Sequence, residues 1–174
     1  MVKNEDDIIK KTNHYLLILW LSCTLFILCA YTLEFIKGEK TQEGMLLYCF
    51  TGIVPYLLVW LYNRRCNGCG KNTALYAMFG YGLFYAVCLI TATKPIVTIY
   101  YIPFIIYILL YDHVSYVIIN CVIVMSINVT SILEWTLAKG RVGTYNFAQY
   151  SVQIALCVMI ILTSYFFYKI IQRI

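Results

Sequence analysis

Charged side chains are scarce in this chain of 174 residues, because Asp, Glu, Lys and Arg together make up 12% of it. A soluble domain carries about 25% charged residues. Hydrophobic residues reach 62% here, so a soluble fold of this size would have too few polar residues for its water-facing surface. The shortage of charge therefore argues against a soluble protein and indicates an integral membrane protein.

No acidic or basic residue lies at the centre of a long apolar segment. Glu34 lies close to the end of one segment, and Asp112, His113 and Glu134 lie between segments. Ionisable residues at membrane depth mark ion and proton paths. Their absence argues against a pump, an ion-coupled transporter or a voltage sensor.

Signatures of catalysis and of cofactor binding are also missing. His14 and His113 have no nucleophile in an elbow motif. We find no zinc-protease, P-loop or dinucleotide-binding pattern. The single C-x-x-C pair, Cys66 and Cys69, supplies two ligands where a zinc site needs four. We therefore expect no enzyme, no cofactor and no metal, and a redox role of this pair stays open.

Six apolar segments of roughly membrane-crossing length fill most of the chain. They cover residues 15–35, 45–62, 73–92, 95–111, 114–133 and 150–171. About 20 helical residues cross a hydrocarbon core about 30 Å thick. The segments do not alternate in polarity, which argues against barrel strands. We predict an all-α polytopic membrane protein with six transmembrane helices in an antiparallel bundle.

Positive charge indicates the direction of insertion. Lys and Arg number eight on the side of the two termini and five on the other side. Because positive loops stay in the cytoplasm, we expect a multi-pass protein of the cell membrane with both termini inside. Residues 1–14 would then be a cytoplasmic segment, 15–171 the transmembrane domain and 172–174 the start of a cytoplasmic helix. No basic cluster interleaved with exposed aromatics indicates nucleic-acid binding.

Aromatic residues share one helical face in the fourth segment. Tyr100, Phe104, Tyr107 and Tyr111 recur at helical spacing, and Pro103 near the middle predicts a bend. A bent helix with an aromatic face could wall a ligand cavity, and plain packing is the alternative.

Small and polar residues in the third and fifth segments predict contacts between helices. The third segment contains Gly80, and Gly82 with Ala86 forms a small-xxx-small pair that permits close approach. In the fifth segment, Asn120 and Asn128 lie at membrane depth. Amides there bond to a neighbouring helix, so we interpret both as contacts between helices.

The sixth segment runs on to Ile174 without a helix-stop signal, and its apolar residues begin a coiled-coil seam. We expect it to continue toward a cytoplasmic output domain and to form a homodimer. A complete small membrane protein is the alternative.

Three stretches resemble the N-terminal six-span region of clostridial-type methyl-accepting chemotaxis proteins, a region also found on diguanylate cyclases and histidine kinases. They are LEFIKGEKT (33–41), residues 79–112, and the closing YFFYKIIQRI. The block around Glu34, Lys37, Gly38 and Thr41 is the most distinctive. The order Asp112 then His113 departs from the family pattern. The resemblance implies sensory transduction without naming a ligand.

We therefore predict a membrane sensory domain, with the lipid bilayer and an unknown small ligand as partners. It would relay a stimulus through the sixth helix to a cytoplasmic output. Candidate ligand-binding residues are Glu34, Tyr100, Tyr107 and Glu134, and candidate transmission residues are Pro103, Tyr165 and Ile171. A transporter or channel subunit for neutral solutes and a passive membrane anchor are the alternatives.

Overall fold

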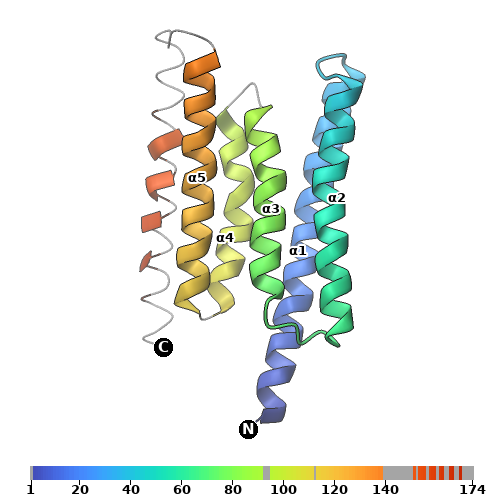
Figure 1. Cartoon of the computed structure of the whole chain (residues 1–174), viewed down its shortest axis with the longest axis vertical. Helices are drawn as coiled ribbons and strands as arrows, with labels where there is room; N and C mark the ends of the chain where they lie inside the picture. Colours follow the sequence, from blue (N-terminus) through green and yellow to red (C-terminus); the bar gives the residue numbers. More distant parts are fainter. Residues whose placement is uncertain are drawn as a thin grey trace. The chain divides into compact units, whose positions relative to one another are not determined.

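The computed structural model shows helices throughout the part of the chain that it describes (Figure 1). Those residues are 2–91, 95–111, 113–138, 151, 153–155, 157–159, 161–162, 165–166 and 169. Their main elements are α1 (Val2–Ile36), α2 (Gln42–Arg65), α3 (Thr73–Ile90), η1 (Pro95–Tyr101), α4 (Ile102–Ile108), η2 (Leu109–Tyr111) and α5 (Val114–Ala138). No strand occurs among these residues, which confirms the all-α class.

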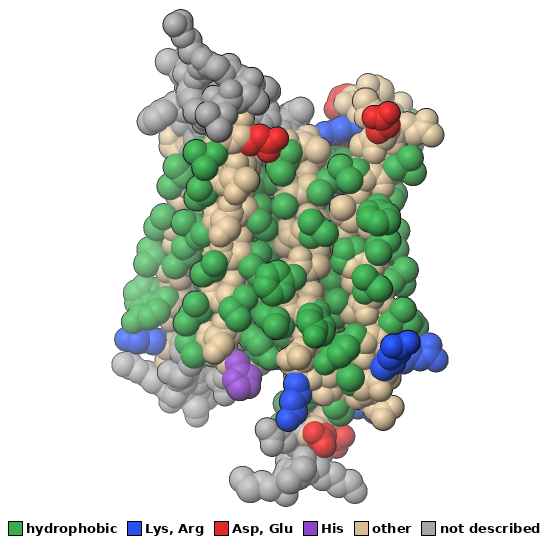
Figure 2. Space-filling view, viewed as in Figure 1, with side chains coloured by type: hydrophobic (Ala, Val, Ile, Leu, Met, Phe, Trp, Pro, Cys, Tyr) green, Lys and Arg blue, Asp and Glu red, His purple; other side chains and the backbone are tan. Residues whose placement is uncertain are grey.

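Within the described residues, four helices are long and apolar enough to cross a membrane: Asp6–Ile36, Gln42–Arg65, Thr73–Ile90 and Val114–Glu134. On the face drawn in Figure 2, hydrophobic side chains cover the helices between their ends, and charged side chains lie at helix ends. Lipid is the medium in which such a surface is stable, since exposed apolar patches of this size are rare on soluble monomers. The helices thus support the prediction of a membrane protein.

The chain divides into two compact units, Met1–Val87 and Cys88–Ile174. Each unit is described by itself below. In the first, α1 and α2 lie side by side (Figure 1). The polar loop between them supplies the N-cap of α2. The side chain of Thr41 accepts a hydrogen bond from the backbone N–H of Gly44 at 3.2 Å. That bond satisfies one of the free donors of the first turn.

Helix α1 begins much earlier than the apolar segment that starts at residue 15. It extends back to Val2, and no Gly or Pro interrupts residues 2–14. The segment expected to be cytoplasmic therefore continues the first long helix as its polar N-terminal turns.

Trp20 of α1 is one of the largest fully buried side chains of the first unit. Its side chain is fully buried, and its ring meets those of Tyr56 and Tyr81 edge-on at centroid distances of 5.5 and 6.4 Å. A Cβ on Gly80 would lie 2.5 Å from Cη2 of Trp20 and 3.1 Å from Cβ of Pro55. Glycine at this position of α3 is therefore what allows the indole ring of α1 to fit.

In the second unit, the fourth apolar segment is not one α-helix. It consists of η1, the short α4 and η2, so the simple bent helix that we predicted is replaced by a change of helix type. Pro103 accounts for this change. It lies in the first turn of α4, where backbone N–H groups have no acceptor within the helix, so the missing N–H of proline costs no hydrogen bond there.

This change of helix type affects the length of the segment. Its ten 3₁₀ residues, seven in η1 and three in η2, rise about 2.0 Å each, compared with about 1.5 Å in an α-helix. With the seven residues of α4, the segment is about 30 Å long, which matches the hydrocarbon core.

Candidate functional site

Two buried amides of α5 form hydrogen bonds with side chains of other segments of the second unit. Asn120 is 1% exposed, and its Oδ1 accepts a hydrogen bond of 2.9 Å from the hydroxyl of Tyr101, which is fully buried. The predicted role of Asn120 between helices is thus confirmed. Its partner Tyr101 was missed, because the helical spacing favoured the face of Tyr100 and Phe104.

Asn128 joins α5 to the sixth apolar segment. Its Nδ2 donates to the carbonyl of Val124 in its own helix at 2.8 Å, and its Oδ1 accepts from Nε2 of Gln153 at 2.8 Å. Both side chains are buried, at 2% and 5% exposed. Gln153 was not among the predicted site residues. The signal that could have found it is a lone amide near the start of an apolar span.

Changing Tyr101 to phenylalanine should lower the free energy of unfolding by about 1 kcal/mol, because it leaves the Asn120 oxygen buried without its donor. The Tyr101→Phe, Asn120→Leu double variant should recover most of that loss, since both polar partners are then gone. Unfolding in mixed micelles, followed by circular dichroism, measures both. Equal loss in the single and double variants would contradict the assignment.

Of the four predicted ligand residues, Glu34 lies in the first unit, near the end of α1. Its Oε2 lies 3.8 Å from Nζ of Lys40, and the Lys40 ammonium also lies 5.2 Å from the ring centroid of Tyr31. Tyr31 stacks on Tyr48 at 3.7 Å. Glu34 thus takes part in the packing of the α1–α2 loop, and its role toward a ligand remains a prediction.

The other three predicted ligand residues belong to the second unit. Tyr107 of α4 is half-buried and packs edge-on against Tyr111 at 6.3 Å, and Tyr100 in η1 is also half-buried. Glu134 is exposed, about 30 Å along α5 from its first residue at 1.5 Å per residue. Tyr107 lies seven residues before the first residue of α5, whereas Glu134 lies near the last turn of α5, so the two do not share one end of that helix.

Two of the three predicted transmission residues, Pro103 and Tyr165, lie among the described residues. Pro103 is exposed and begins α4. The exposed ring of Tyr165 lies 5.7 Å from that of Phe166 and 5.1 Å from Nζ of Lys169. Ile171 lies outside the described residues.

A cluster of buried polar side chains lies where α1 meets the end of α2 and the loop that follows it. Nδ2 of Asn13 on α1 lies 3.2 Å from Oδ1 of Asn63 on α2, 2.9 Å from the carbonyl of Gly68 and 3.1 Å from that of Gly70. The hydroxyl of Thr73 donates to the same Asn63 oxygen at 3.1 Å. One asparagine therefore ties α1 to the end of α2, to the following loop and, through Asn63, to the start of α3.

The loop that Asn13 holds has a defined shape. Asn67 and Gly68 have φ of +54° and +87°, and the Gly68 N–H donates to the carbonyl of Asn63 at 2.8 Å. This left-handed turn ends α2 and satisfies one of its last carbonyls.

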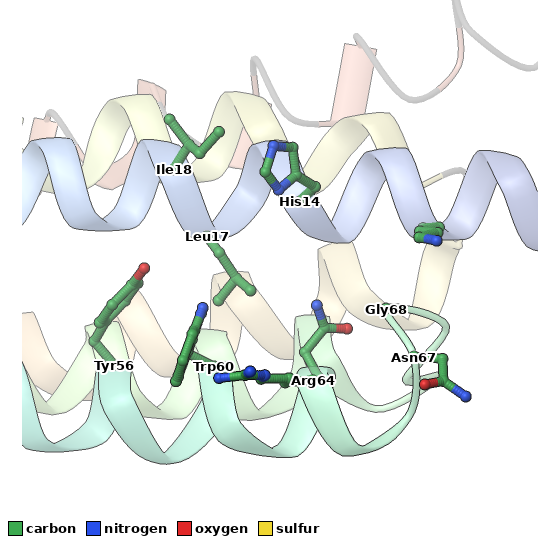
Figure 3. A pocket seen from close by; sticks show the side chains of 10 residues that line it. His14, Leu17, Ile18, Tyr56, Trp60, Arg64, Asn67 and Gly68 are labelled. Carbon is green, nitrogen blue, oxygen red and sulfur yellow. The ribbon is translucent and has the colours of Figure 1, made fainter.

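Next to this cluster, α1, α2 and the loop line an open cavity of about 400 Å³ (Figure 3). It is lined by Lys10, His14, Leu17, Ile18, Tyr56, Trp60, Asn63, Arg64, Asn67 and Gly68. Tyr56 and Trp60 rise from α2 toward α1, and Leu17 points back from α1 (Figure 3). None of these residues was predicted as a site. Lys10 and Arg64 were interpreted through topology alone.

Comparison with known proteins adds no assignment: no protein-family model, no curated protein and no solved structure matches the chain. Function must therefore be argued from the contacts described above.

Proposed function

We propose that this chain is the membrane input domain of a bacterial signal-transduction protein, most simply a chemoreceptor. Six helices cross the membrane with both termini in the cytoplasm, and the sixth passes a stimulus to an output domain as a homodimer. Four helices of crossing length support this arrangement. The length of about 30 Å of segment 95–111 and the apolar sequence of 150–171 support two further crossings.

The observation that carries the proposal is the hydrogen bond between Asn128 and Gln153. A relay through the sixth helix needs two alternative registers of this helix against α5. It also needs a contact that is formed in one register and broken in the other. Apolar packing against lipid-like side chains selects registers poorly, whereas a buried amide pair is satisfied only when its two members face each other. Small helix shifts at such contacts are a common route of transmission.

The pair can bias a signalling equilibrium by an appreciable amount. Interhelical hydrogen bonds in membranes contribute about 0.6–2 kcal/mol, which corresponds to about a 3- to 30-fold change in the ratio of two states. This range is sufficient for an input domain whose output depends on the fraction of active state.

A test fuses a known output domain after Ile174 and measures its activity in Asn128→Leu and Gln153→Leu. We expect both to change basal output about 3-fold or more, and the double variant to equal either single one. Thr130→Ala is the matched control, because the Thr130 hydroxyl is exposed and bonds to its own helix at Ser126. The predicted residues Tyr107 and Pro103 are tested in the same assay by Tyr107→Ala and Pro103→Ala.

The alternatives give different results in the same system. Regulation that survives replacement of residues 1–174 by an unrelated six-helix anchor would identify a passive anchor. Solute uptake by proteoliposomes that contain only this chain would identify a transporter. Output that is unchanged in every variant would refute the relay.

A further inference from the structure

The cavity between α1 and α2 combines positive charge with an apolar wall. Lys10 and Arg64 supply the charge, and His14 lies between Lys10 and Leu17 along α1. Leu17 and Ile18, one turn further along α1, and the aromatic rings of Tyr56 and Trp60 supply the apolar side (Figure 3). No acidic residue lines it. Its chemistry fits a ligand with an anionic end and an apolar end.

Both cations are held in place by contacts of the fold. The Arg64 guanidinium carbon lies 5.3 Å from the ring centroid of Trp60, within the range of a cation–π interaction, which favours a position of the charge beside the cavity. The stem of Lys10 packs on the backbone of Gly68, where a Cβ would lie 2.8 Å from Cγ of the lysine. The positive φ of Gly68 and the bond from Asn13 to its carbonyl hold that backbone in turn.

These cations are available to a ligand. Among the side chains that the structure describes, neither Lys10 nor Arg64 forms an ion pair with a carboxylate. Asp6 and Asp7 lie one turn before Lys10 on α1 and are exposed. Neither lines the cavity. An anion that entered would therefore meet positive charge and no carboxylate on the cavity wall itself.

The side chains around the cavity indicate the kind of molecule to which the anionic group belongs. Ile18, which lines the cavity, and Leu57 and Leu61 of α2 are exposed apolar side chains. Trp60 lies close to the end of α2, in the position that aromatic residues take at a membrane interface. A phosphate beside Lys10 and Arg64 would thus leave its glycerol and acyl chains along an apolar surface that leads into the bilayer.

We propose that this cavity binds the phosphate of an anionic phospholipid, with Arg64 and Lys10 as its ligands and the Trp60 ring beside its glycerol. Planar guanidinium groups bind phosphate through paired hydrogen bonds, and lysine adds a point charge. Basic pockets between membrane helices are known to accept such head groups. The proposal needs the membrane location of the chain and does not depend on the sensory role.

The test uses the purified full chain in neutral detergent and counts bound molecules by native mass spectrometry during titration with phosphatidylglycerol. We expect one molecule to bind more tightly than phosphatidylcholine, and Lys10→Gln with Arg64→Gln to weaken it about 10-fold or more. The matched control is Lys11→Gln with Arg65→Gln, which removes two adjacent exposed charges outside the cavity. It should change the affinity less than about 3-fold.

Three other outcomes of this experiment would each overturn the proposal. Equal loss in the two double variants would assign the binding to general charge attraction and overturn the site. Sodium phosphate is the competitor that distinguishes the two sources of phosphate. If it binds with the same dependence on Lys10 and Arg64 and competes fully with the lipid, the ligand is free phosphate, and the lipid proposal is overturned. Absence of preferential phosphatidylglycerol binding in the unchanged protein would also overturn it. A circular-dichroism melt confirms that the variants compared are folded.

Discussion

Gly80→Ala is expected to lower the free energy of unfolding by about 2 kcal/mol, although alanine is the better helix former. The added Cβ would lie 2.5 Å from Cη2 and 3.0 Å from Cζ2 of Trp20. The indole ring is rigid and is flanked by Tyr56 and Tyr81, so it has little room to move. Overpacking of this kind costs about 1–3 kcal/mol and here outweighs the helix-propensity gain of about 1 kcal/mol.

Most of this cost should disappear when Trp20 is phenylalanine. That ring lacks the two indole atoms nearest to the new Cβ, so only the contact with Cβ of Pro55 at 3.1 Å remains. Gly80→Ala in the Trp20→Phe background should therefore change the free energy of unfolding by less than about 1 kcal/mol. Unfolding in mixed micelles of the four proteins of this double-mutant cycle gives the coupling. A similar effect of Gly80→Ala in both backgrounds would show that the two residues do not touch.

Asn13→Leu is expected to cost about 2–3 kcal/mol of the free energy of unfolding, and to loosen the loop between α2 and α3. Leucine has the branched shape of asparagine but donates no hydrogen bond, so the carbonyls of Gly68 and Gly70 lose the side-chain amide that holds them to α1. A buried carbonyl without its partner carries a desolvation cost of about 1–3 kcal/mol. Hydrogen exchange at residues 66–72 measures the local effect, and unfolding in mixed micelles measures the total.

Thr32→Ala on the same helix is the control for this substitution. The Thr32 hydroxyl bonds to the carbonyl of Leu28 one turn earlier at 2.7 Å, so its loss removes no contact between helices. We expect a change within about 0.5 kcal/mol. If Asn13→Leu changed stability no more than Thr32→Ala, the polar cluster would not hold α1 to the loop.

Local features of the helices could be predicted from the sequence because they depend on neighbouring residues. The polar residues 37–41 end one apolar run and supply Thr41 as a cap, and α2 begins there. Pro103 predicted a disturbance in the fourth segment, and the structure changes helix type there. Hydropathy did not reveal this change of type, because the mean hydropathy of a segment is the same whether its turns are 3₁₀ or α.

The candidate sites were predicted much less well, and the aromatic residues of the fourth segment show why. Helical spacing grouped Tyr100 with Phe104 and Tyr107, yet the hydrogen bond to Asn120 comes from Tyr101. The spacing rule assumes an α-helix, and Tyr100 and Tyr101 lie in η1, where each residue turns further around the axis. The need of Asn120 for a partner could be predicted, whereas the identity of that partner could not.

The sequence by itself determined that the chain suits lipid, that it folds into helices, and that its buried amides need partners. Only the tertiary structure decided that Trp20 packs against Gly80, and that Lys10 and Arg64, distant in the chain, line one cavity. The physical reason is that a helix in lipid is apolar on the face toward its neighbours and on the face toward the bilayer. Hydropathy then leaves rotation and register open, and shape and hydrogen bonding set them.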